Sequence, residues 1–274
     1  MNKLQSRIQA RQTNHAFTNI RDKRLMENSL FNDYLFDLLD SLEQNLSAFL
    51  TDQNPESLHR LRLDIKKIKA LLSCAEYMNQ EKYDATKLKP LFRKAGEIRE
   101  MHLNIHLLSS APQPPKRLIN QLKKEKNILT QQFIENGSGY IKLVKDFKGG
   151  ICFPEIRWGK KRIIKFFEKE QKKTTKILQN IDREGMHEYR KKIKKMVYVY
   201  NALPKRIQNK IDLNEAGITK QQKKLGDWHD TYSAIHFLSS RPLPLKTTEY
   251  VFKLKAKEKR RFDKLLTTLI KKRK

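Results

Sequence analysis

Hydrophobic residues recur every three or four positions along most of the chain, which is the spacing of one face of an α-helix. Long segments rich in Lys, Glu, Leu and Gln run between few glycines, of which there are nine in 274 residues. This pattern favours helices over a β fold with many turns. We therefore expect an all-α protein. The predicted helices lie at about 29–50, 55–78, 84–110, 114–136, 157–181, 185–202, 214–240 and 244–272.

Prolines and glycines divide these helices into two groups. Asn54-Pro55 is typical of a helix start, because proline at the first helical position loses no hydrogen bond. Proline-rich stretches at 112–115 and 242–244 separate successive helices within each group. Several glycines and a proline near the midpoint predict a linker. The expected organisation is a basic lead-in at 1–28, a four-helix half at 29–136, a linker at 137–156 and a second four-helix half at 157–274.

The two halves share an ordered set of motifs. Residues 58–67, LHRLRLDIKK, align with 186–195, MHEYRKKIKK, with identical His, Arg, Ile and Lys-Lys positions. The motif Ile-His-x-Leu-Ser-Ser-x-Pro then occurs at 105–112 and again at 235–242. A glycine followed by acidic residues precedes it in both halves, at 96–100 and 226–230. Because basic helices do not share such an order by chance, we expect an internal duplication with pseudo-twofold symmetry.

The repeated helix carries a basic flank beside its apolar stripe. Leu58, Leu61 and Ile65 lie on a stripe about 80° wide, at 100° per residue, and the next arc of about 80° holds cations without an acid. The outward arcs hold Arg60, Asp64 and Lys67 in one copy and Glu188, Lys192 and Lys195 in the other. Cations at the edge of a packed face point into the groove between helices. The flanks, which we expect to line one basic channel, hold His59, Arg62, Lys66 and Lys69 in the first half and His187, Arg190 and Lys194 in the second.

The charge balance indicates the class of partner. With 59 Lys and Arg against 30 Asp and Glu, the formal net charge is +29, and such an excess disfavours a compact state unless a polyanion neutralises it. Nucleic acid, an anionic membrane surface and a polyphosphate all fit. No stretch approaches the ~20 apolar residues of a membrane span, and two cysteines make no disulfide framework or metal motif. We expect a soluble, cytoplasmic protein without a metal or cofactor.

Further candidates lie near the shared glycines. Arg99 projects near the core edge and could extend the channel, with His229 as its counterpart. Glu100 and Asp230 are expected to orient nearby cations. His59 and His187 could either contact an anion or make a structural hydrogen bond. The remaining candidate channel residues are Lys67, Arg93, Lys94, Lys191, Lys195, Lys223 and Lys224.

The pattern His-x-x-Arg-x-x-x-Lys-Lys, at 59–67 and 187–195, resembles the CHAD family, the conserved histidine α-helical domain. The resemblance covers about 29–270. It implies two four-helix bundles with a basic central surface that binds inorganic polyphosphate without catalysis. Glu100, His229 and Val197 depart from the family pattern. The family's basic positions fall on His59, Arg62, Lys66, Lys67, Lys69, His187, Arg190, Lys194 and Lys195.

Three functions fit these features to different degrees. The first is a stand-alone polyphosphate-binding module that meets polyphosphate-metabolising enzymes or granules. The second is a helical RNA-binding protein that uses the same surface, although its aromatic residues Tyr189 and Tyr200 lie on the core stripe. The third, a phosphate hydrolase or kinase, needs clustered carboxylates or a glycine-rich phosphate loop. The sequence has neither, so the expected protein is not an enzyme.

Overall fold

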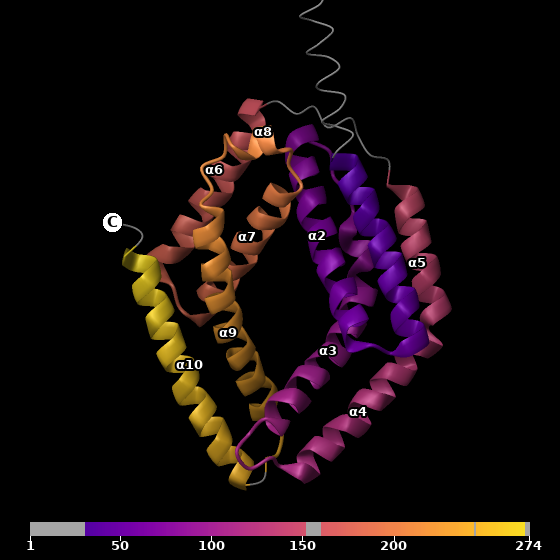
Figure 1. Ribbon diagram of the computed structural model, residues 1–274, viewed down its shortest axis with the longest axis vertical. Helices are drawn as coiled ribbons and strands as arrows, with labels where there is room; N and C mark the ends of the chain where they lie inside the picture. Colours follow the sequence, from indigo (N-terminus) through magenta and orange to yellow (C-terminus); the bar gives the residue numbers. More distant parts are fainter. Residues whose placement is uncertain (1–30, 152–159, 244, 272–274) are drawn as a thin grey trace, which may run out of the picture.

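The computed structural model describes residues 31–151, 160–243 and 245–271, and these residues form helices joined by short turns, without a strand (Figure 1). The predicted all-α class is confirmed. Among these residues no helix is both long enough and apolar enough to cross a membrane. The predicted lead-in at 1–28 lies outside the described residues.

The first half begins with a helix at 31–52, followed by α2 (Pro55–Asn79), the short 3-10 helix η1 (Ala85–Leu88), α3 (Lys89–Ser109) and α4 (Lys116–Glu135). The start of α2 is capped as the sequence predicts. The side chain of Asn54 accepts a hydrogen bond from the Glu56 N–H at 2.9 Å, and Pro55 is the first helical residue. The four predicted helices of this half are confirmed to within a few residues.

The second half contains α6 (Lys160–Ile177), η2 (Leu178–Asn180), α7 (Arg183–Asn201), α8 (Lys205–Gln208), α9 (Glu215–Ser239) and α10 (Leu245–Lys271). The carboxylate of Asp182 caps α7 by accepting from the Gly185 N–H at 2.7 Å. The long helices again match the prediction, whereas the short α8 was not predicted. The internal duplication itself stays a prediction of the sequence.

The predicted linker is wrong for much of its length, because Gly137–Gly150 forms helix α5. Its side chains Val144 and Phe147 are buried in the core. Gly137 lies so close to Leu50 that a Cβ there would come within 2.9 Å of a leucine methyl group. The glycine therefore allows α5 to approach the 31–52 helix. Residues 152–159 of the predicted linker lie outside the described residues.

The two halves meet at both ends of the molecule. Helices α2 and α7 pack together, and the ends of α3 and α9 converge at the opposite end (Figure 1). One hydrophobic core spans both halves and includes Leu61 of α2 and Met196 of α7. A second core, with Leu108 and Leu238, joins α3, α4, α9 and α10. These contacts hold α2 and α7 in a fixed relation across the centre.

Candidate functional site

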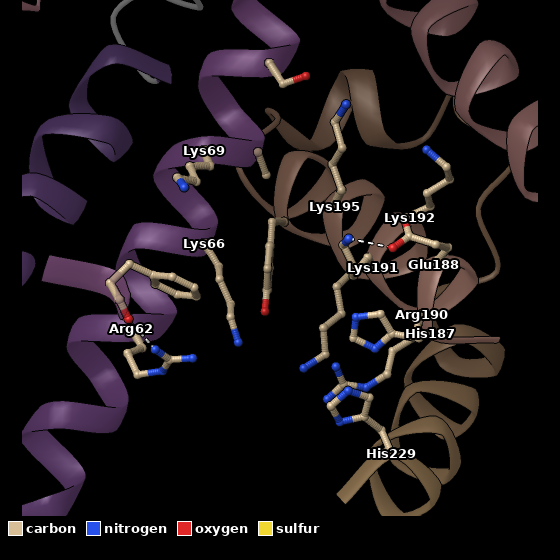
Figure 2. Close-up of a pocket in the computed structure, with 15 residues that line it drawn as sticks. Arg62, Lys66, Lys69, His187, Glu188, Arg190, Lys191, Lys192, Lys195 and His229 are labelled. Carbon is tan, nitrogen blue, oxygen red and sulfur yellow. Dashed lines mark hydrogen bonds and ion pairs between the residues drawn. The ribbon is translucent and has the colours of Figure 1, made fainter. Parts of the chain in front are cut away.

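A cavity of about 560 Å³ lies between the two halves, with α2 and Phe92 of α3 on one side and α7 with His229 of α9 on the other. Figure 2 shows the charged ends of side chains from both sides directed into this space. Because the apolar stripes of α2 and α7 are buried in the core, the flanks beside those stripes face one another. The lining consists of Arg62, Lys66, Lys69, Ala70, Ser73, Phe92, His187, Glu188, Arg190, Lys191, Lys192, Lys194, Lys195, Tyr198 and His229.

Cations dominate this lining. It contains eight lysines and arginines and two histidines, against the single acid Glu188. Glu188 accepts a hydrogen bond from Lys191 at 2.7 Å, so its charge is already paired. The sequence predicts that Glu188, Lys192 and Lys195 of α7 face outward. This prediction is wrong, since all three line the cavity. The flank is wider on α7 than on α2.

Of the predicted site residues, the structure brings Arg62, Lys66, Lys69, His187, Arg190, Lys191, Lys194 and Lys195 into the cavity lining. The other seven predicted residues do not line it: His59, Lys67, Arg93, Lys94, Arg99, Lys223 and Lys224.

Arg93 and Lys94 lie on another face of α3. Lys94 donates to Glu97 at 2.9 Å, and Arg93 lies 3.9 Å from the same carboxylate. Burial raises the pKa of Tyr140 on α5, and the charges of all three residues also act on it. Arg93 and Lys94 are thus paired with Glu97 and lie outside the cavity lining.

Lys67 does not line the cavity and lies near Asp64 of the same helix. Its charge acts on Asp64, which is 4% exposed and accepts hydrogen bonds from Ser41 at 2.8 Å and Asn45 at 2.9 Å. The assignment of Asp64 to an outward arc is therefore wrong. Burial raises the pKa of Asp64, although these hydrogen bonds and the positive charge of Lys67 lower it in part.

His59 and Arg99 lie close to the cavity without lining it. Burial and the charge of Arg99 lower the pKa of His59, and Lys66 and Lys194 also contribute. Arg99 itself lines a small neighbouring pocket with His102. Lys223 and Lys224 are exposed on α9 and also lie outside the lining.

Phe92 of α3 lies beside the cations that α2 contributes to the cavity. The sequence pattern did not identify this residue. The guanidinium carbon of Arg62 lies 4.1 Å from the ring centroid. The amino groups of Lys66 and Lys69 lie 5.7 Å and 5.5 Å from the same centroid. These are cation–π distances, so one ring on α3 holds three cations of α2 in place. Position 92 lies one turn before the shared Gly96, which is the signal that could have identified it.

The lowered pKa values of the lysines in the cavity indicate an excess of positive charge. Burial within the cavity, together with the charges of Arg62 and Lys194, lowers the pKa of Lys66 to about 8. The side chain of Lys66 nevertheless keeps contact with solvent. Burial also lowers the pKa of Lys194, and the charge of Arg190 adds to this effect. An anion in the cavity would reverse these shifts by favouring the charged lysines.

Two histidines meet at the α7–α9 side of the cavity. The rings of His187 and His229 stack with their centroids 4.7 Å apart and an interplanar angle of 21°. Burial and the neighbouring charge of His229 lower the pKa of His187. Each ring offers an N–H donor to a bound oxyanion in at least one protonation state. Of the two histidine candidates, His187 thus lines the cavity, whereas His59 does not.

Two acids, Glu170 and Asp230, lie close to cations that line the cavity. Lys195 lies 3.6 Å from the buried carboxylate of Glu170. Burial raises the pKa of Glu170, but the hydrogen bond from Lys173 and the charge of Lys195 outweigh burial and leave the pKa lowered. Asp230 is largely exposed and lies 3.8 Å from Nδ1 of His229. Although partial desolvation raises its pKa, the hydrogen bond from His229 and the charge of Arg190 leave the pKa lowered. Its orienting role stays a prediction.

The described residues contain no group of three or more His, Cys, Asp or Glu side chains that could hold a metal ion. Cys74 is a free, buried thiol, and burial raises its pKa to about 12. Such a thiol is inert at neutral pH, because the thiolate is the reactive form. The chemistry of the cavity is therefore that of Lys, Arg and His donors.

Comparisons with known proteins agree with this architecture. A family model described as the CHAD domain matches residues 33–239. The structure is similar to the crystal structure of the CHAD domain from the plant Ricinus communis, with a TM-score of 0.59 and 15% sequence identity. That match covers 86% of this chain and 87% of the other, and at this identity it shows a shared fold. No curated protein matches the chain.

Proposed function

This chain belongs to the CHAD family, and on that premise we propose that it binds inorganic polyphosphate, without catalysis, in the cavity between α2 and α7. The observation that carries the proposal is a lining of eight lysines and arginines with one acid, which is itself paired. A linear polyanion with about one charge per phosphate supplies the missing negative charge and releases its counterions on binding.

The donor types suit phosphate oxygens. Arginine contacts them through a planar fork of N–H groups, and lysine acts as a mobile point charge. Lys66 and Lys194 both have lowered pKa values in the free protein, so a phosphate between them would relieve their repulsion. This electrostatic relief supports a polyanionic ligand over a neutral or cationic one.

A ligand without bases fits the cavity better than a nucleic acid. Proteins that bind single strands offer free aromatic faces on which bases stack. The cavity is lined by the rings of Phe92 and Tyr198, and Arg62 already covers Phe92 at 4.1 Å. His187 and His229 stack on each other. RNA binding is the alternative that this arrangement disfavours.

The absence of catalysis is also part of the proposal. Phosphoryl transfer generally needs a metal held by carboxylates or a phosphate loop rich in glycine. The one carboxylate in the cavity lining belongs to Glu188 and pairs with Lys191. Because the described lining has neither a carboxylate cluster nor such a loop, we expect it to bind a phosphate chain without cleaving it.

A competition assay tests the proposed ligand. Labelled single-stranded RNA bound to the protein should be displaced more readily by long-chain polyphosphate than by unlabelled RNA. We expect polyphosphate to need a concentration of phosphate groups at least about 10-fold lower, because most of the described lining is cationic and Arg62 already covers the Phe92 ring. Fluorescence anisotropy at fixed ionic strength measures both curves. Equal or better displacement by RNA would assign the cavity to nucleic acid instead.

A further inference from the structure

Arg62 and Arg190 occupy matching positions in the two motifs, but their surroundings differ. Nη1 of Arg62 donates a hydrogen bond to the carbonyl oxygen of Phe92, and its guanidinium lies over the Phe92 ring. Gly96 makes room for this arrangement, since a Cβ at that position would collide with Nη1 of Arg62. The side chain of Arg62 is therefore anchored to α3 from several directions.

Arg190 lacks the same anchors. Its Nε atom is buried and has no hydrogen-bond partner among the described residues. The residue at the position of Phe92 is Gln222, whose Nε2 atom is also buried and has no partner in the described part of the chain. A Cβ at Gly226, the counterpart of Gly96, would meet no atom of the described residues within 4 Å. The space that Arg62 fills in the first half is thus open in the second.

A buried donor without a partner is costly, because it has lost its water without gaining a protein acceptor. Figure 2 shows Arg190 beside His187 and His229 at the cavity. These three side chains present N–H donors from α7 and α9 to the same region. A phosphoryl oxygen there would satisfy Arg190 and also accept from an imidazole.

We propose that the two matching arginines have different tasks: Arg190, together with His187 and His229, forms the subsite that grips a phosphoryl oxyanion, whereas Arg62 is a structural residue that fixes the opposite wall. This inference rests on the proposed function and specifies it. The bound chain is then held unequally, by directed hydrogen bonds on the α7 side and by the point charges of Lys66 and Lys69 on the α2 side.

Two substitutions that keep the positive charge test the division of tasks. Arg190→Lys should raise the Kd for long-chain polyphosphate about 10-fold and leave the melting temperature unchanged, because lysine loses the planar fork but not the charge. Arg62→Lys should lower the melting temperature and change the Kd by less than about 2-fold, because the lost contacts lie within the protein. Anisotropy titrations and thermal unfolding measure the two effects.

A third variant rebuilds the missing anchor. Gln222→Phe places a ring where the first half has Phe92, so it should draw Arg190 over α9 and weaken binding about as much as Arg190→Lys does. An Arg62→Lys chain too unstable to assay would support the structural role, and the other two variants would then decide the role of Arg190. Equal losses of affinity in Arg62→Lys and Arg190→Lys would overturn the inference but leave the proposed function intact. A wild-type chain that does not bind polyphosphate would overturn both.

Discussion

Replacing Lys66 and Lys194 together with glutamate should weaken the binding of long-chain polyphosphate by at least about 100-fold, as expected when close charge pairs at an interface are reversed. The charge of Lys194 acts on the pKa of Lys66, so the two lysines face the same part of the cavity from opposite helices. Glutamates there would repel the phosphates that the lysines attract. Isothermal titration calorimetry at fixed ionic strength measures the loss.

The matched control is Lys223→Glu with Lys224→Glu, which changes the net charge by the same amount on the exposed face of α9. It should change the affinity by less than about 5-fold, because exposed charges are screened by salt. The cavity variant should also melt at an equal or higher temperature than the wild type, since it removes two mutually repelling cations. Equal losses of affinity in both variants would mean that polyphosphate responds only to overall charge.

The second large effect concerns stability. Glu258→Ala should lower the free energy of unfolding by about 2 kcal/mol, as expected when a buried donor loses its charged acceptor. Glu258 of α10 is 4% exposed and accepts two hydrogen bonds from Arg183, at 2.9 Å and 3.0 Å. It also accepts from the indole N–H of the fully buried Trp228 at 2.7 Å. Alanine would leave that indole N–H buried without an acceptor.

Urea unfolding followed by circular dichroism measures this change. Glu249→Ala on the same helix is the control, because Glu249 is exposed and surface substitutions usually stay within about 0.5 kcal/mol. A loss below about 1 kcal/mol for Glu258→Ala would contradict the view that this carboxylate ties α7, α9 and α10 together.

The long helices could be predicted from the sequence because their apolar periodicity is strong and proline marks several of their ends. Helix α5 could not, since four glycines lie between 137 and 150 and glycine normally disfavours a helix. At Gly137 the structure explains why a glycine lies in this helix, because the absence of a side chain lets Leu50 pack against it. Val144 and Phe147 pack the same helix against the core. Such a packing role of glycine becomes visible only when the partner helix is placed.

The candidate site was predictable as far as the repeated basic motif extends, and at His229 beside the shared glycine. On each repeated helix the direction of the basic flank follows from the buried stripe beside it. This flank holds Arg62 and Lys66 on α2, and Arg190 and Lys194 on α7. Phe92 lies outside that motif, and its role depends on how α3 crosses α2. Arg93 and its neighbour Lys94 are equally basic, yet they pair with Glu97 on another face. Charge alone therefore does not indicate which cations reach the cavity.

The sequence motif also did not predict that Arg62 and Arg190 make different contacts. A shared motif predicts a shared role, but the residue at the position of Phe92 is Gln222, which changes what Arg190 can contact. The difference arises from α3 and α9 rather than from the motif helices themselves.

The most direct test is a crystal structure of the wild-type protein with bound long-chain polyphosphate. Phosphate density should run between α2 and α7, with oxygens within hydrogen-bonding distance of Lys66, Arg190 and Lys194. Density confined to the outer faces of the helices, with an empty cavity, would contradict a central binding site.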